Sequence, residues 1–310
     1  MFKEAIHISS DDRSGSTMLD LALASHEQIF SVGEAHNLSA YIFNDRTFYN
    51  PVHELKCMCG KKIEDCDFWN EVEHRLGFSF KKLRLRVEKP ASQLSFPFFN
   101  YIHSHADSFV QSRFPALFLM KFVQVLLGYD KITEHYFLLY KALSEVSKKE
   151  KIVDSSKWPF RFKAFYDKYP DKLKVILLYR DPRAVVYSKF KRREETIESA
   201  AKKWADMANK MELFGRTLPS EKKIKVRYED ICSDPKEYFK KICSFLGVEF
   251  SESMMTLKKV NIHHVGGSPS KFDKEKINIK HDNEYTANLD ANQLQVISKI
   301  TANAAKGIYG

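Results

Sequence analysis

Two polar segments, far apart in the chain, carry residue types that bind anions. The first is Arg13-Ser14-Gly15-Ser16-Thr17, which follows the short, mainly apolar segment 5–8 and precedes the helix-like run 18–23. Glycine lets the backbone turn around an anion, while hydroxyl groups, backbone N–H groups and an arginine can donate hydrogen bonds to it. A turn that opens a helix adds unpaired N–H groups and the positive end of the helix dipole. This segment therefore predicts a site for a phosphate-type group.

The second segment begins with Arg180-Asp181-Pro182-Arg183, directly after the apolar run Val175–Tyr179 that predicts a buried strand. Ser188 follows Arg180 by eight residues, about two helical turns. Taken alone, these residues also fit a helix-capping turn followed by an exposed serine. Two anion sites, each at a strand-to-helix junction, instead suggest one ligand with two separated phosphate-type groups.

Neither the nucleoside-triphosphate loop Gly-x4-Gly-Lys-Ser/Thr nor the dinucleotide fingerprint Gly-x-Gly-x-x-Gly is present at the first turn. The two segments together resemble the nucleotide motifs of sulfotransferases that use 3′-phosphoadenosine-5′-phosphosulfate (PAPS). The resemblance runs over residues 4–35 and from 151 to the C-terminus, and the pattern from Cys57 to Trp69 looks like bacterial members. It implies that the first segment binds the phosphosulfate end of the donor through Arg13, Ser14, Gly15, Ser16 and Thr17. Arg180 and Ser188 would then bind the 3′-phosphate.

Two later segments extend the resemblance. Val226–Ile231 matches a recurrent late segment whose tyrosine, here Tyr228, lies near the nucleotide in relatives, although Tyr228 also fits a packed strand residue. Residues 264–271 occupy the place of a basic, glycine-containing nucleotide loop. Ser268 stands there in place of an asparagine and Lys271 in place of an arginine, and both are implied donor contacts.

Sulfuryl transfer needs a base for the acceptor proton and positive charge at the leaving oxygen. Glu34 follows a short expected strand and so lies at the carboxyl edge of the sheet, where open α/β proteins bind ligands. The resemblance implies Glu34 as general base, because some branches of the family use a glutamate in a similar Gly-Glu context; capping the next helix is the alternative. Lys157 and Arg13 are implied as the cations at the leaving oxygen, although Lys157 also fits an ordinary lysine at a helix start.

Three of the five cysteines cluster in the sequence as Cys57, Cys59 and Cys66. An odd number of cysteines and an N-terminus without a secretory apolar segment disfavour a disulfide framework and favour a cytoplasmic protein. Three thiolates with His53 or His74 could hold a structural zinc ion. Paired Cys-x2-Cys knuckles are missing, so we expect reduced or locally paired cysteines and no metal-binding residue. We expect transfer itself to need no metal, because cationic side chains can balance the charge of a sulfuryl group.

Apolar runs alternate with helix-like segments at both ends of the chain. Strands are expected near residues 4–9, 29–32, 151–154, 172–179 and 224–228. Continuous apolar strands joined by helices are typical of a parallel sheet covered on both faces. The predicted fold is therefore α/β, with a central parallel sheet flanked by helices; the resemblance implies the P-loop NTPase-like sulfotransferase fold. We expect one domain over residues 1–310, with a long, mainly helical insertion at about 36–148 on the acceptor side.

The composition limits the partners only broadly. The 310 residues are 44% apolar, enough for a sizeable core, and 50 Lys+Arg against 40 Asp+Glu give a net charge of +10, which favours anionic partners. The basic residues are spread through the chain rather than interleaved with stacking aromatics, so no nucleic-acid partner is expected. The most apolar stretch, 114–127, is too short to span a bilayer, so we expect a buried helix there and no integral membrane segment.

The sequence therefore favours a PAPS-dependent sulfotransferase whose acceptor is a hydroxyl-bearing carbohydrate, lipid-linked compound or small metabolite. A nucleotide-dependent kinase of related fold, which would need magnesium and a nucleoside triphosphate, is one alternative. A non-enzymatic polyanion-binding module is the other. No motif in the sequence specifies the acceptor or the oligomeric state.

Overall fold

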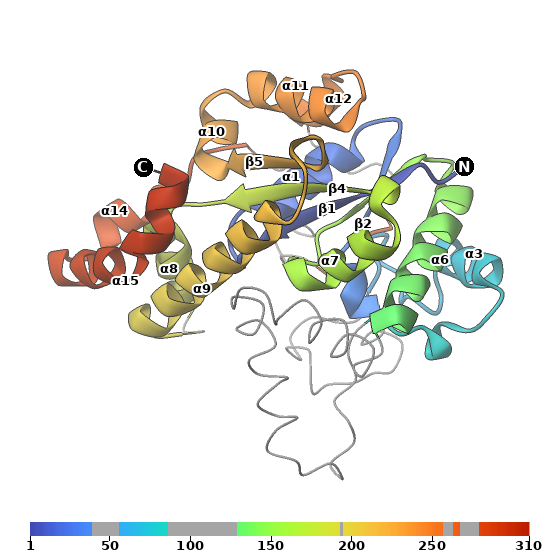
Figure 1. Cartoon of the computed structure of the whole chain (residues 1–310), viewed down its shortest axis with the longest axis horizontal. Coiled ribbons are helices and arrows are strands. Elements are labelled where there is room, and N and C mark those ends of the chain that lie inside the picture. Colours follow the sequence, from blue (N-terminus) through green and yellow to red (C-terminus); the bar gives the residue numbers. More distant parts are fainter. Residues whose placement is uncertain (39–55, 86–128, 193–194, 257–262, 267–278, 310) are drawn as a thin grey trace, which may run out of the picture.

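The computed structural model describes residues 1–38, 56–85, 129–192, 195–256, 263–266 and 279–309. Within these residues, five parallel strands form one sheet in the order β2-β3-β1-β4-β5 (Figure 1). The strands are β1 (Glu4–Ser10), β2 (Ile29–Gly33), β3 (Lys151–Asp154), β4 (Leu173–Tyr179) and β5 (Lys223–Arg227). The expected strands and the parallel α/β architecture are thus confirmed, with boundaries that differ by one or two residues.

Helices cover both faces of this sheet. The described α-helices are α1 (Ser16–Ala24), α3 (Asp67–Leu76), α6 (Tyr129–Ser147), α7 (Pro159–Lys168), α8 (Pro182–Lys191), α9 (Ile197–Arg216), α10 (Tyr228–Ser233), α11 (Pro235–Leu246), α12 (Ser253–Thr256), α14 (Tyr285–Asn288) and α15 (Ala291–Tyr309). None of the helices in the described part of the chain is both long and apolar enough to cross a membrane.

The two hydrophobic cores follow from the alternation of side chains along the strands. In β4, Val175 and Leu177 pack into a core that also contains buried residues of α6, α7 and α9. Their neighbours Ile176 and Leu178 pack into the opposite core, with buried residues of α1, α11 and α12. Successive residues of a strand point to opposite faces, so a continuously apolar strand is buried on both sides.

The segment between β2 and β3 is mainly helical where the structure describes it. It contains the short helices η1 (Ala35–Asn37) and η2 (Phe80–Lys82) besides α3 and α6, which lie next to the β2 edge in Figure 1. The helix expected at 114–127 falls outside the described residues, and the division into one domain with an acceptor-side insertion stays a prediction. Beyond the carboxyl end of β4, α8, α14 and α15 lie near the C-terminus (Figure 1).

One expected boundary is wrong. Tyr228 is the first residue of α10 and does not continue the strand, because β5 ends at Arg227. Its side chain is therefore directed by the first turn of a helix at the carboxyl edge of the sheet, and it is 9% exposed.

Candidate functional site

The loops after β1, β3 and β4 meet at one edge of the sheet. β1 pairs in parallel with β3 on one side and with β4 on the other, so the carboxyl ends of these three strands lie side by side. The turn 11–15 follows β1, Ser155–Lys157 follows β3, and Arg180 follows β4. In open α/β proteins, ligands bind at the carboxyl ends of the strands, next to the point where the strand order reverses.

The turn after β1 has the backbone shape that an anion site requires. Gly15 adopts a φ of 87° as the N-cap residue of α1, and Arg13 adopts a φ of 66°, which is uncommon for a residue with a side chain. A Cβ atom on Gly15 would lie 2.4 Å from Cδ2 of Tyr228, so only glycine fits there. The first amide groups of α1 have no partner within the helix and face this turn. Gly15 is therefore required both by its backbone conformation and by the small space beside the Tyr228 ring.

Arg180 connects the second predicted motif to the first. Its Nη1 donates a hydrogen bond to the carbonyl oxygen of Arg13 at 2.9 Å. Nε of Arg13 in turn donates to Oγ of Ser188 at 3.2 Å, from the first motif to a residue on α8. Nε1 of Trp204 donates to the carbonyl oxygen of Arg180 at 3.1 Å and fixes the backbone of that residue. The structure therefore brings the Arg13 turn, Arg180 and Ser188 into one site.

Tyr228 and Asp282 complete the surroundings of Arg180. The Arg180 guanidinium lies over the Tyr228 ring, 4.5 Å from its centroid, and the Tyr228 hydroxyl donates to the carbonyl oxygen of Lys280 at 2.8 Å. Nη2 of Arg180 also pairs with Oδ2 of Asp282 at 2.9 Å. Burial opposes ionisation of Asp282, but the hydrogen bonds from Arg180 and from the Glu284 backbone, together with the nearby positive charges, outweigh burial and lower the pKa of that carboxyl. Tyr228 thus lies beside the predicted phosphate-binding arginine, and Asp282 is a neighbour that the sequence did not reveal.

Lys157 lies between two carboxylates at the end of β3. Its Nζ is 2.7 Å from Oε1 of Glu34 and 2.7 Å from Oδ1 of Asp12, the residue before Arg13. Burial alone would lower the pKa of Lys157, but the charges of Glu34 and Asp12 outweigh burial and raise it. Conversely, the charge of Lys157 lowers the pKa of Asp12. Lys157 therefore stays a cation between the expected base and the anion turn.

The backbone at Lys157 is strained in the same way as that at Arg13. Lys157 has a φ of 66°, in the left-handed region that costs a non-glycine residue about 1–3 kcal/mol. Such conformations persist only where the surrounding structure holds them, and they gather at functional sites. Both predicted cations of the transfer step thus sit on strained backbone at the carboxyl edge of the sheet.

Glu34 is positioned by a segment from the C-terminal part of the chain. Its backbone N–H donates to the carbonyl oxygen of Val265 at 2.8 Å, and its Oε2 accepts a hydrogen bond from Nδ2 of Asn37 at 2.7 Å. Gly33, with a φ of 76°, allows this approach, because a Cβ atom there would lie 2.3 Å from the Val265 carbonyl oxygen. Gly33 is therefore required by this packing, whatever the role of the Glu34 carboxylate.

A fully buried aspartate, Asp20 on α1, joins the elements behind the site. Its carboxylate accepts hydrogen bonds from Oγ of Ser31, from Oγ of Ser155 at 2.7 Å and from Nε2 of His264 at 2.7 Å. These partners belong to β2, to the turn before Lys157 and to the segment that contacts Glu34. This network was not predicted from the sequence, although an aspartate within the apolar run 18–23 is a visible signal.

A buried ion pair connects the anion turn to α8. Nζ of Lys189 lies 2.9 Å from Oδ2 of Asp11, and the two side chains are 4% and 11% exposed. Burial raises the pKa of Asp11, and the Lys189 charge partly opposes this. The pair fixes the turn beside Ser188, and it too was missed from the sequence.

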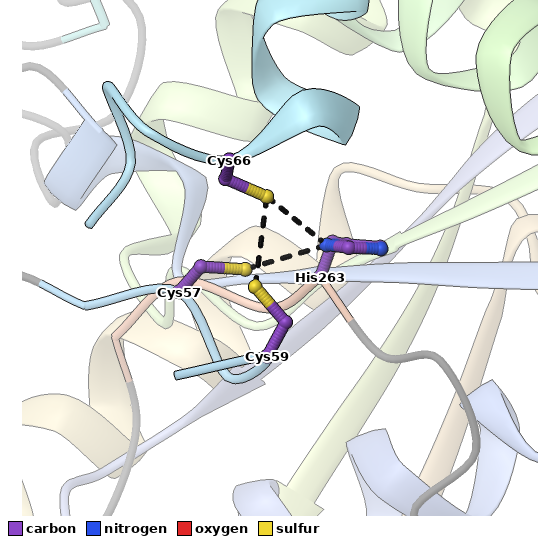
Figure 2. Close-up of side chains that lie close together, drawn as sticks. All are labelled: Cys57, Cys59, Cys66 and His263. Carbon is purple, nitrogen blue, oxygen red and sulfur yellow. Dashed lines mark hydrogen bonds between the residues drawn. The ribbon is translucent and has the colours of Figure 1, made fainter. Parts of the chain in front are cut away.

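Two implied donor contacts, Ser268 and Lys271, lie outside the described residues. The clustered cysteines lie beside the segment 263–266 that also contacts Glu34, since Met58 N–H donates to the His264 carbonyl and Glu34 N–H to the Val265 carbonyl. There Cys57, Cys59 and Cys66 meet His263 (Figure 2). His74, one of the two histidines considered as their partner, is instead exposed on α3, and His53 lies outside the described residues. The partner histidine was therefore not predicted.

The sheet order, the turn after β1 and the arginine after β4 define an α/β protein in which the two predicted anion motifs meet at the carboxyl ends of the strands. Residues 6–252 match the model of the Sulfotransferase family, so the chain belongs to that family, and the resemblance seen in the sequence is confirmed.

Solved structures agree with the fold. The chain is similar to the sulfotransferase domain of the Synechococcus PCC 7002 olefin synthase, at 20% identity and a TM-score of 0.55, over 96% of this chain and 93% of that one. It is also similar to the sulfotransferase domain of the curacin biosynthetic pathway, at 18% identity and a TM-score of 0.50, over 99% and 98% of the two chains. No curated protein matches the sequence significantly.

Proposed function

We propose that this chain transfers a sulfuryl group from PAPS to an acceptor hydroxyl. The observation that carries the proposal is the chain of hydrogen bonds from Arg180 to the Arg13 carbonyl and from the Arg13 side chain to Ser188. It makes the two anion motifs one continuous site, as a donor with a 5′-phosphosulfate and a 3′-phosphate requires. Arginine suits both groups because its planar fork of donors matches tetrahedral oxyanions.

In the proposed step, the acceptor oxygen attacks sulfur in line with the bridging oxygen of the phosphosulfate. The new O–S bond forms as the old S–O bond breaks, and the electron pair of the old bond stays on the 5′-phosphate of 3′,5′-adenosine bisphosphate. The acceptor proton leaves to a base, so the products are a sulfate ester, the bisphosphate and a protonated base. Charge therefore builds up at the leaving oxygen and at the base.

Glu34 is the proposed base and Lys157 the proposed cation at the leaving oxygen. The two groups are already paired, with Oε1 of Glu34 2.7 Å from Nζ of Lys157. As Glu34 takes up the acceptor proton, Lys157 is free to turn to the departing phosphate oxygen. Arg13 is proposed to support the same charge from the anion turn.

A nucleotide-dependent kinase remains the competing enzyme. It would bind a nucleoside triphosphate with magnesium, held by carboxylates beside the phosphate loop. The carboxylates beside this loop are already paired with lysines, Asp11 with Lys189 and Asp12 with Lys157. This pairing favours a donor whose charge is balanced by side chains, and we propose that transfer needs no metal at the reacting group.

The acceptor is proposed only as a class, a hydroxyl-bearing carbohydrate, lipid-linked compound or small metabolite. A cytoplasmic location is part of the same proposal, because an odd number of cysteines disfavours a disulfide framework and so fits a reducing compartment.

The proposal is tested with PAPS carrying labelled sulfur, a panel of acceptor alcohols and a buffer without added magnesium. Transfer of label to an acceptor is expected for the wild type and for Arg183→Ala, whose guanidinium is 46% exposed and pairs with Asp181. It is expected to be lost with Arg180→Ala. Phosphoryl transfer from ATP and magnesium, with no sulfuryl transfer, would establish the kinase instead.

A further inference from the structure

The cluster of Cys57, Cys59, Cys66 and His263 has the composition and the shape of a metal site (Figure 2). Its four donor atoms, three Sγ atoms and Nδ1 of His263, all lie within 4.8 Å of one another. Cys66 is the N-cap residue of α3, and Cys57 and Cys59 come from the tight turn that precedes it. His263 comes from nearly two hundred residues further along the chain. None of the four takes part in the proposed transfer.

The spacing of the donor atoms matches a tetrahedron around one ion. With Zn–S bonds of about 2.3 Å and a Zn–N bond of about 2.0–2.1 Å, a tetrahedral site has S–S edges of about 3.8 Å and S–N edges of about 3.6 Å. The Cys59 and Cys66 sulfurs are 3.6 Å apart, and Nδ1 of His263 lies 3.5 Å from Cys57 Sγ and 3.3 Å from Cys66 Sγ. A disulfide between Cys59 and Cys66 would use only two of the four donor atoms. It would not explain why Cys57 Sγ and His263 Nδ1 lie close to them.

The local structure holds each donor in this arrangement. In the cysteine turn, Cys57 N–H donates to the carbonyl of Lys61 at 2.9 Å, and Gly60 N–H donates to the carbonyl of Cys57 at 2.9 Å. The ring of His263 stacks on Phe68, with centroids 4.4 Å apart and planes within 2° of parallel, so that Nδ1 is directed at the sulfurs. Packing that orients a ligand in this way is typical of built metal sites.

We propose that these four residues bind one structural Zn²⁺ ion. Three thiolates and one imidazole are a closed four-ligand set of the kind found in structural zinc sites, whereas catalytic sites keep a position open. Sulfur ligands in tetrahedral geometry favour zinc over magnesium, calcium or manganese. Binding releases the thiol protons to solvent, and the site needs no other reactant.

The ion would join the cysteine turn to the segment that positions Glu34. Next to His263, the His264 carbonyl accepts a hydrogen bond from Met58 N–H at 3.3 Å, and Val265 N–H donates to Val32 at 3.0 Å. Zinc would therefore anchor residues 263–266 against the end of β2. This inference does not depend on the proposed sulfuryl transfer, since metal binding is measured without donor or acceptor.

The test is metal analysis of the full chain purified without added metal or chelator, combined with a count of free thiols. We expect about one zinc per chain in the wild type, lost in Cys59→Ser and His263→Ala and kept in the controls His74→Ala and Cys243→Ala. Cys59 is exposed, so its replacement tests binding with little effect on packing. Restoring the chelated protein with Co²⁺ is expected to give the thiolate-to-cobalt absorption of a tetrahedral site, and His263→Ala is expected to lack it.

Removing zinc is also expected to lower the Tm by about 5 °C or more and to speed amide hydrogen exchange at residues 263–266 and 32–34. The proposal is overturned by wild-type protein that takes up no zinc on addition of Zn²⁺, by a Cys59–Cys66 disulfide in freshly purified protein, or by iron bound in place of zinc. Full zinc content in His263→Ala would overturn it as well. None of these results bears on whether the chain transfers a sulfuryl group.

Discussion

Arg180 donates a hydrogen bond to the carbonyl oxygen of Arg13 at 2.9 Å, across more than 160 residues of sequence. This contact places the arginine after β4 directly against the turn after β1. The two anion motifs, which the sequence identifies only separately, are therefore adjacent in one site. The lysine and glutamate at the ends of β3 and β2 lie beside the same turn, because Asp12 joins it to Lys157.

Replacement of Glu34 by glutamine tests the proposed base. Glutamine keeps the size of the side chain but cannot accept a proton, so kcat for sulfuryl transfer is expected to fall by about 10²–10⁴-fold. Binding of 3′,5′-adenosine bisphosphate should stay within a few-fold of wild type, since the bisphosphate carries no acceptor. The control is Glu27→Gln on the surface, which should leave both values unchanged. A kcat for Glu34→Gln within about threefold of wild type would remove Glu34 as the base.

Replacement of Lys157 by methionine tests the cation at the leaving oxygen. Methionine keeps the aliphatic length but loses the charge, and loss of one such donor commonly lowers kcat by about 10²–10³-fold. Lys163→Met is the matched control, because Lys163 pairs only with Asp167 on α7 in the described contacts. The measurement is kcat for sulfuryl transfer in both variants. Equally small decreases in kcat for Lys157→Met and Lys163→Met would show that Lys157 has no part in the transfer.

Asp282 is expected to compete with the 3′-phosphate for Arg180. Its carboxylate lies 2.9 Å from Nη2 of Arg180 and its side chain is 47% exposed, so an incoming phosphate must displace it. An exposed ion pair contributes about 0.2–1 kcal/mol, so Asp282→Asn should lower the Kd for 3′,5′-adenosine bisphosphate by up to about fivefold. Glu284→Gln, which breaks a nearby pair with Lys191, is the control. Weaker binding by Asp282→Asn would instead make Asp282 part of the ligand site.

Asp154 predicts a pH dependence of stability. Burial raises the pKa of this carboxyl to about 6, although hydrogen bonds from Ser156 and Tyr140 partly oppose the shift. The ordinary value in an unfolded chain is about 3.9. Between about pH 4 and 6 the folded state therefore binds more protons than the unfolded state, and this residue's contribution to the free energy of unfolding falls as the pH rises, by up to roughly 3 kcal/mol.

Denaturant unfolding of the wild type and of Asp154→Asn, from pH 4 to pH 7, measures that contribution as a difference. The wild type should lose stability relative to the variant as the pH rises from about 4 to about 6, with little further change above that. Asp171→Asn, at an exposed site, should show no such difference. A wild type that gains stability relative to Asp154→Asn over this range would contradict the assigned shift.

The fold was predictable because its signals are local. Continuous apolar runs such as Val175–Tyr179 mark strands buried on both faces, and the turn at Gly15 can be identified from residue types alone. Tyr228 was assigned to the strand because an aromatic residue that follows Ile224 and Val226 fits the end of a strand as well as the start of a helix. The resemblance implies that Tyr228 lies near the nucleotide, which stays a prediction; in the structure the Arg180 guanidinium packs on the Tyr228 ring.

The rest of the site could not be predicted because its partners meet only in three dimensions. Asp20 is one residue in an apolar run, and nothing near it in sequence names His264 or Ser155 as its partner. The same holds for His263, which joins the cysteines from the other end of the chain, while nearer histidines were the natural candidates. Contacts between residues so far apart follow no fixed spacing in the sequence, so the sequence alone does not predict them.

Calorimetric titration with 3′,5′-adenosine bisphosphate, without magnesium, tests the central claim most directly. The account predicts micromolar binding by the wild type and by Arg183→Ala, and a Kd raised at least about tenfold by Arg180→Ala, Ser188→Ala or Arg13→Ala. Equal binding by Arg180→Ala and Arg183→Ala, or binding of ATP with magnesium in preference to the bisphosphate, would contradict it.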